Sequence, residues 1–376
     1  MDWQQGGCRT DAGDGALMAK RGRKLDEFAE LASAEQAAAR LRVERVLRSS
    51  GGTVDSIAAA AQVKAEFVRT MVAELEAAHV IIRRDGGKLS VGRDMAPAWS
   101  LSDVPFEYRS RKDNTYLFGA VSDSHLGSKY ERMDALNDLY DRFAAAGVDR
   151  VIHCGNWVDG DSRLNAHDLH TRGLEPQLAY LAREYPHRKG IVTYAVTGED
   201  HEGWWTRSEG IDIGKRAEQT MREAGRDDWV NIGFMEAHLR LVNENSGEGS
   251  ILAAVHPGGG TAYALSYSVQ KIIEALEGGE KPGVALYGHY HKLWCGNIRN
   301  VWVAQTGCTQ DQTIFTRNKI KQEVHIGGLL VELEQDPRTG AIIAMAPQMI
   351  RYFAKGYYTG RWSRSGTVRL PRREIS

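Results

Sequence analysis

The first pattern of hydrophobic and polar positions has a helical period. Apolar side chains recur every three or four residues along three stretches, which predicts helices at residues 34–47, 54–60 and 65–79. Thr53 stands where its hydroxyl can cap the second helix. Two short apolar runs then flank Asp85-Gly86-Gly87, a sequence typical of a tight hairpin turn. We therefore expect three helices followed by a two-stranded hairpin.

This order of elements resembles the winged helix-turn-helix family over residues 34–92. The resemblance implies DNA binding through the third helix. Lys64 and Arg69 are the outward cations there, however, and three glutamates accompany them, whereas a helix that reads DNA is usually more basic. A winged helix used for dimerisation or protein contact is the alternative.

After residue 114 the pattern changes to short β-rich runs that alternate with helix-like stretches. Alternation of this kind predicts a layered α/β domain over residues 114–350. The expected strands are at 115–121, 150–154, 190–196, 250–255 and 283–287, and the expected helices are at 133–146, 174–184, 213–224 and 262–278. Strand-like runs at 300–305, 327–334 and 341–350 predict added antiparallel strands.

Three stretches lack this patterning. Residues 1–33 are Gly- and Asp-rich at their start and are expected to be flexible, and residues 93–113 contain Pro97 and Pro105 and are expected to form a linker. In residues 351–376 cations alternate with aromatic side chains, a composition that suits a nucleic-acid backbone and stacked bases. A solvated basic tail or a segment that docks a partner is the alternative.

Composition narrows the class of protein. A hydrophobic content of 42% and a charged content of 26% are ordinary for globular domains. The net charge of -1 gives no overall field that attracts nucleic acid, so any such binding depends on local patches. The four cysteines form no C-x-x-C pair, and no apolar run approaches the ~18 residues of a membrane span. We expect a cytoplasmic protein without a membrane partner.

Metal-capable residues follow directly after the predicted strands of the α/β domain. These residues are Asp123, His125, Asn156, Asp200, His256, His289 and His291. Because binding sites form at the carboxyl ends of strands in such sheets, we expect them to converge. Hard oxygens mixed with imidazole nitrogens favour manganese, iron or zinc over calcium or magnesium alone. Seven ligands exceed the needs of one ion and predict two divalent ions, with manganese the first choice and magnesium an alternative.

The order Asp-x-His, Gly-Asn, Gly-x-Asp-His, His and Gly-His-x-His resembles the calcineurin-like metallophosphoesterase superfamily over about residues 115–350. The stretch 122–127, Ser-Asp-Ser-His-Leu-Gly, is similar to the first motif of its nuclease branch, which processes DNA breaks. The resemblance implies a four-layer β-sandwich flanked by helices, and phosphoester hydrolysis at two metal ions. It also implies a possible homodimer and an ATPase partner.

Carried over residue by residue, the resemblance implies two ligand sets. One metal ion is held by Asp123, His125 and His291, and the other by Asp200, His256 and His289. Asn156 stands between them. The resemblance also implies catalytic roles for Asp123 and for His201, the residue at the position that protonates the leaving oxygen.

Two positions depart from the family pattern together. Asn156 stands where the family has a bridging aspartate, and Asp200 stands where it has an asparagine. The count of ligating carboxylates is unchanged, which indicates a compensated exchange. A neutral amide bridges two cations less well, so weaker occupancy is the alternative, and Asp159 or Asp161 is a candidate substitute carboxylate.

Four further residues are candidates for substrate contact: His167, His170, Trp204 and Gln312. Trp204 can instead pack its loop against the core. The leading hypothesis is a DNA nuclease or phosphodiesterase, an exonuclease-like enzyme with two metal ions. Two alternatives remain open: a phosphoesterase for small nucleotides or phosphoproteins, and a DNA-binding or scaffolding protein with a weakened site.

Overall fold

The computed structural model describes residues 33–93, 106–163, 165–260 and 262–354. The chain divides into two compact units, Met1–Gly92 and Arg93–Ser376. The predicted flexible N-terminus, apart from residue 33, and the tail beyond residue 354 lie outside the described residues.

The smaller unit consists of three helices and one hairpin. The helices span residues 33–49, Val54–Ala61 (α2) and Ala65–Ala77 (α3), and the hairpin pairs β1 (Ile82–Asp85) with β2 (Lys88–Val91). Thr53 accepts a hydrogen bond from the Ser56 N–H at 3.2 Å and so caps α2. The elements follow the predicted order, and their buried side chains, including Val43, Leu47, Ile57 and Val68, form a separate small core.

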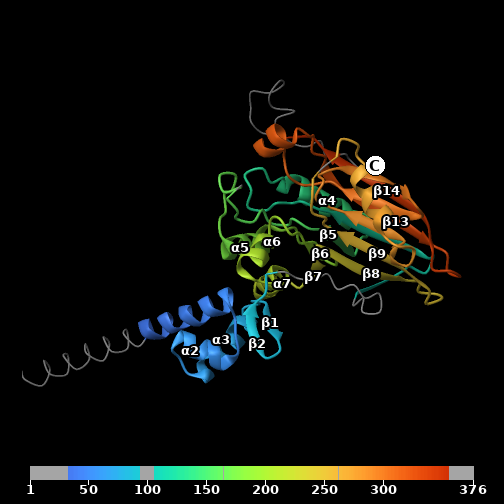
Figure 1. Cartoon of the computed structure of the whole chain (residues 1–376). Coiled ribbons are helices and arrows are strands. Elements are labelled where there is room, and N and C mark those ends of the chain that lie inside the picture. The colour runs from blue at the N-terminus through green and yellow to red at the C-terminus, as the bar shows by residue number, and fades with distance from the viewer. Residues whose placement is uncertain (1–32, 94–105, 164, 261, 355–376) are drawn as a thin grey trace, which may run out of the picture. The chain divides into compact units, whose positions relative to one another are not determined.

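In the larger unit four strands run parallel (Figure 1). They are β4 (Thr115–Val121), β5 (Arg150–Cys154), β6 (Val192–Thr197) and β7 (Trp229–Phe234). Two long antiparallel strands, β13 (Ile326–Gln335) and β14 (Ile342–Tyr352), extend this half of the sheet beside β4. The antiparallel additions predicted at 327–334 and 341–350 are confirmed.

The second half of the sheet begins after a sharp turn at Met235, whose φ is 63°. Its strands are β8 (Glu236–Val242), β9 (Gly249–Val255), β10 (Val284–Tyr287), β12 (Val301–Thr306) and, at the edge, β11 (Leu293–Ile298). β3 (Phe106–Arg109) pairs with β8, so the predicted linker 93–113 was wrong for these four residues. Phe106 and Tyr108 pack on the core between the sheet halves, which overrides the polar composition around them.

The two halves pack face to face with helices outside them. Phe118, Ile152, Leu239, Leu286 and Leu329 belong to one buried cluster between the halves. Side chains of α4 (Met133–Ala145), α5 (Leu174–Glu184) and α7 (Ile213–Glu223) pack with the first half, and those of α8 (Tyr267–Ala275) pack with the second. The predicted α/β sandwich flanked by helices is confirmed. The helix expected at 262–278 is shorter, because α8 begins only at Tyr267 and ends at Ala275.

Within the described residues, no helix has the length and apolar character needed to cross a membrane.

Candidate metal centre

The seven predicted ligands lie in loops that directly follow β4, β5, β6, β9 and β10. In five of them the backbone adopts the left-handed conformation, with φ between 47° and 73°: Asp123, His125, Asn156, His289 and His291. Residues other than glycine rarely adopt this backbone conformation, and strain of this kind clusters at functional sites. The local backbone therefore sets these loops apart before any side-chain chemistry is considered.

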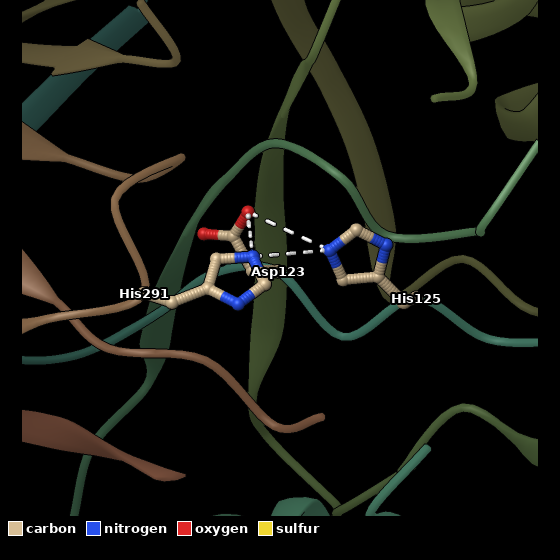
Figure 2. Close-up of side chains that lie close together, drawn as sticks. All are labelled: Asp123, His125 and His291. Carbon is tan, nitrogen blue, oxygen red and sulfur yellow. Dashed lines mark hydrogen bonds and ion pairs between the residues drawn. The ribbon is translucent and has the colours of Figure 1, made fainter. Parts of the chain in front are cut away.

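Asp123, His125 and His291 form the first group (Figure 2). Asp123 Oδ1 lies 3.2 Å from His291 Nε2 and 3.7 Å from His125 Nε2, and the two Nε2 atoms are 3.3 Å apart. Asp123 and His125 are almost fully buried. Three donor atoms so close together, each able to present a lone pair, form a chelating face.

The remaining polar atoms of this group orient it. Asp123 Oδ2 accepts hydrogen bonds from the Ser122 hydroxyl and from the His289 N–H at 2.9 Å, which leaves Oδ1 without a partner. His125 Nδ1 lies 2.7 Å from Asp159 Oδ1. A carboxylate behind an imidazole fixes the ring and its tautomer, so that Nε2 faces the centre.

Asp200, His256 and His289 form the second group. Asp200 Oδ1 lies 3.7 Å from His256 Nε2, and its Oδ2 lies 3.6 Å from His289 Nδ1. His256 Nδ1 donates to the Cys154 carbonyl at 2.6 Å, and His289 Nε2 donates to the Gly259 carbonyl at 2.7 Å. The backbone thereby selects opposite tautomers for the two rings and directs the free nitrogen of each toward Asp200.

Asn156 presents a buried Oδ1 atom that has no hydrogen-bond partner. A Cβ at Gly198 would overlap this oxygen and crowd the His256 ring, so only glycine leaves room for it. The loop is held by Glu202, whose Oε1 accepts the N–H groups of Asn156 and Gly198 at 2.9 and 2.6 Å. Burial raises the pKa of Glu202 to about 7, against the opposing effect of His256.

The donor set fits metal ions. Five buried nitrogen or oxygen atoms of the predicted ligands have no hydrogen-bond partner: Asp123 Oδ1, Asn156 Oδ1, Asp200 Oδ1, His256 Nε2 and His291 Nδ1. Burial alone would raise the pKa of Asp123, but His291 and His125 hold it well below its ordinary value. Both carboxylates remain ionised, because Asp200 has a lowered pKa for a similar reason, through His201 and His256. Buried anions and orphaned acceptors that converge in this way are compatible with bound cations.

His201 lies beside the first group without belonging to it. Its Nδ1 donates to the Asp159 carbonyl oxygen at 2.8 Å, and its ring contacts the His125 ring edge-on at 4.3 Å between centroids. Burial opposes the charged form, but the carboxylates of Asp200 and Asp159 raise the pKa of His201 to about 10. This environment favours the charged ring, whose Nε2 can donate a proton.

A cavity of about 390 Å³ opens over the centre. It is lined on one side by His125, Asn156, Asp200 and His201, and on another by Thr313, Phe315, Thr316 and Ile320. None of the four predicted substrate residues is among its lining residues.

The structure places those four residues elsewhere. His167 offers its backbone carbonyl to Lys129 Nζ at 2.7 Å, and His170 lies 3.1 Å from Glu131. Trp204 packs against the core, as the alternative for this residue held. Gln312 donates to the Gln322 carbonyl at 2.7 Å. The segments that contain the predicted residues do reach the cavity, because Asp168, Gln310 and Thr313 line it. The side chains that were predicted do not line it.

The structure gives Asp159 and Glu202 roles that the sequence did not predict. Asp159 was a candidate substitute ligand, and with His125 and His201 it forms a third group whose donor atoms lie close enough to hold a metal ion. Its Oδ1 lies 2.7 Å from His125 Nδ1 and 3.2 Å from His201 Nδ1, so it also orients both rings. Asp161 is taken up by Arg172 at 2.9 Å and by the Gly173 N–H. Glu202 had no assigned role, although a glutamate directly after His201 was a visible signal.

No protein-family model and no curated protein matches the sequence. Among solved structures, an archaeal phosphodiesterase is 13% identical with a TM-score of 0.33, over 62% of this chain and 100% of that chain. A predicted phosphoesterase from Streptococcus pneumoniae TIGR4 is 14% identical with a TM-score of 0.28, over 63% and 98%. Vps29 from Chaetomium thermophilum is 11% identical with a TM-score of 0.32, over 64% and 99%. Likenesses of this size transfer no residue role, so the chemistry rests on the side chains described above.

Proposed function

We propose that this protein is a metal-dependent phosphodiesterase that cleaves DNA at a two-metal centre. The observation that carries the proposal is the pair of converging donor groups on adjacent loops, with the orphaned amide oxygen of Asn156 on the loop that follows β5. Two such groups with mixed oxygen and nitrogen donors suit two divalent transition ions, and manganese is our first choice. Two ions held there would supply Lewis-acid chemistry to a phosphoryl group and would activate water at neutral pH.

The chain's own residues supply orientation and a proton. Asp123, His125 and His291 would hold one ion, and Asp200, His256 and His289 the other. Asp159 contacts the rings of both His125 and His201. One carboxylate would therefore orient both a metal ligand and the proton donor. Protonated His201 faces the cavity and would give its proton to the leaving oxygen.

DNA as the substrate is supported by features outside the centre. The smaller unit has the element order of a winged helix, and the end of the chain interleaves cations with aromatic residues. A phosphodiester linked to nucleosides also fits a cavity that has both polar and apolar walls. We propose that the smaller unit and the tail bring the strand to the centre.

The test measures metal content and hydrolysis together. The manganese-loaded protein, with Asp123→Ala and His201→Ala, is assayed on bis-p-nitrophenyl phosphate and on labelled single-stranded and double-stranded DNA. We expect about two ions per chain, fewer ions in Asp123→Ala, and a rate about 10²–10⁴ lower in His201→Ala with its metal retained. A protein that binds no transition metal and cleaves neither substrate would overturn the proposal. Cleavage of the small ester alone would keep the phosphodiesterase and exclude DNA.

A further inference from the structure

The connection between β12 and β13 carries an exposed segment, residues 314–321, with the sequence Ile-Phe-Thr-Arg-Asn-Lys-Ile-Lys. It contains a π-helix, Thr316–Ile320, that ends at Lys321 with a φ of 58°. π-Helices are rare and occur frequently at functional sites, and long connections in compact domains are often functional. The segment contributes no residue to the groups of metal-capable side chains.

The segment exposes large apolar side chains. Ile314 is 62% exposed and Phe315 is 53% exposed. Phe315 and Ile320 line the same cavity as Asn156 and Asp200. An apolar wall therefore stands within one small-ligand cavity of the donor groups, positioned to contact whatever is attached to a phosphoryl group there.

The same segment is strongly basic. Arg317, Lys319 and Lys321 are exposed, and the segment contains no acidic residue. Among the described residues none of the three forms an ion pair with a carboxylate, and Arg317 donates through Nε to the uncharged Gln312 at 3.1 Å. Three unpaired cations on a chain of net charge -1 form a local site for a polyanion.

Side-chain amides hold the segment in place. Gln312 donates to the Gln322 carbonyl at 2.7 Å, across the base of the segment. Gln322 donates in turn to the Ala262 carbonyl at 3.0 Å, on the loop whose Gly259 carbonyl fixes His289. The segment is therefore attached to the metal centre through two hydrogen bonds and one short loop.

We propose that residues 314–321 recognise single-stranded nucleic acid, with Phe315 stacking on a base next to the scissile phosphate and the three cations holding flanking phosphates. An aromatic wall combined with several cations is the chemistry of single-strand binding. A cavity of about 390 Å³ has room for one nucleotide unit. This inference rests on the proposed phosphodiesterase function and names its substrate.

The cations are tested by binding, without catalysis. Fluorescein-labelled (dT)12 is titrated in EDTA at 50–200 mM KCl with the full chain and with Arg317→Gln/Lys319→Gln/Lys321→Gln. Each phosphate contact on a single strand contributes about 0.7 to the slope of log affinity against log salt, so we expect the slope to fall by about 2. The matched control, Lys112→Gln/Lys189→Gln/Arg338→Gln, removes exposed cations from the opposite, amino-terminal edge of the parallel strands and should keep the wild-type slope. The tail, residues 351–376, is present in all three proteins, so its contribution to binding cancels in the comparison.

Phe315 is tested by removing the base instead of the side chain. Manganese-dependent kcat/KM is measured on a 12-mer and on the same 12-mer with abasic sites around the scissile phosphate. We expect the wild type to prefer the intact strand by about tenfold, and Phe315→Ala to reduce that ratio to near one. Ile343→Ala, an exposed apolar change on β14, should keep the ratio.

The outcomes separate the two proposals. An unchanged salt slope in the triple variant would overturn the role of 314–321 even if DNA is cleaved, and so would a wild type indifferent to abasic sites. If the triple variant instead loses binding to phosphatidylserine vesicles and keeps its binding to (dT)12, the segment recognises a lipid surface and the inference is wrong. A protein without metal or hydrolysis fails as a phosphodiesterase, while a reduced salt slope would still support nucleic-acid recognition by the segment.

Discussion

Backbone strain is concentrated at the residues that would bind metal. A left-handed conformation at a residue other than glycine costs on the order of 1–3 kcal/mol and persists only where the surroundings enforce it. Here the enforcement is visible: the N–H of Asp123 donates to the Gly155 carbonyl at 2.9 Å, and that of His125 donates to the Asn156 carbonyl at 3.0 Å. The loops after β4 and β5 therefore hold each other in the conformation that brings their side chains together.

The exchange between Asn156 and Asp200 can be tested as a pair. Asp200→Asn alone leaves Asp123 as the one carboxylate among the seven ligands, so we expect it to lose about one ion per chain. Asn156→Asp/Asp200→Asn restores two carboxylates and should recover the ion. The readout is manganese per chain after dialysis, followed over a concentration series for Asn156→Asp, Asp200→Asn and the double variant. A compensated exchange gives non-additive affinities, with a coupling of about 0.5–3 kcal/mol, whereas additive losses would show that the two positions act separately.

At this scale the sequence predicted which side chains lie close together better than it predicted the hydrogen bonds that orient them. Asp123, His289 and His291 stand in short motifs after strands, which makes them visible. The tautomers of His256 and His289 depend on the carbonyls of Cys154 and Gly259, and a backbone carbonyl has no sequence signature. The candidate substrate residues carry no such motif, and none of the four lines the cavity.

At the scale of elements, one arginine ties α5 to β7. Arg226 donates through Nη1 to the carbonyls of Ala182 and Tyr185 at 3.0 and 2.9 Å, at the end of α5. Asp228, just before β7, holds the same guanidinium at 2.7 and 2.8 Å. The last carbonyls of a helix have no N–H donor within the helix, and here the guanidinium supplies the missing donors.

Removing the negative partner should therefore weaken this junction in a pH-dependent way. Although burial would raise the pKa of Asp228, Arg226 and His187 lower it. A lowered carboxyl pKa stabilises the fold above the unfolded pKa of about 3.9, and that stabilisation is lost as pH falls through the folded value. We expect Asp228→Asn to cost about 1–3 kcal/mol at pH 7, with the difference from wild type shrinking below about pH 4. Urea unfolding at several pH values measures it, and the exposed Asp141→Asn serves as the control. A pH-independent difference would contradict the ionic explanation.

Sequence reasoning missed β3, β7, β8 and β11, and for β8 and β3 the physical reasons differ. β8 alternates polar and buried side chains, with Glu236 and Arg240 outside and Leu239 and Leu241 inside, so it lacks the continuous apolar run that marked β4. β3 is short and follows a Pro-containing stretch, and only its pairing with β8 makes it a strand. Runs buried on both faces were predicted almost to the residue, because their composition alone requires burial.

For the whole molecule, the described tryptophans all lie in the larger unit: Trp157, Trp204, Trp205, Trp229, Trp294 and Trp302. The described part of the smaller unit contains none, and its core is separate. Eight of the nine tryptophans belong to Arg93–Ser376 and one, Trp3, belongs to Met1–Gly92. Tryptophan fluorescence therefore follows mainly the unfolding of the unit that contains the metal centre, whereas helical circular dichroism follows both units. The same chain provides a reporter and an internal reference.

Metal binding should stabilise the larger unit selectively. A ligand that binds only the folded state at 100 times its Kd adds about 2.7 kcal/mol, which corresponds to about 5–10 °C in the Tm of a domain of this size. We expect manganese to raise the fluorescence transition by that amount and EDTA to reverse it, because buried Asp123, Asn156 and His256 then regain partners for their orphaned atoms. His125→Ala/His256→Ala should remove the shift. A manganese shift that persists in this variant would place the bound ion away from the two donor groups, and a shift confined to the dichroism signal would place it in the smaller unit.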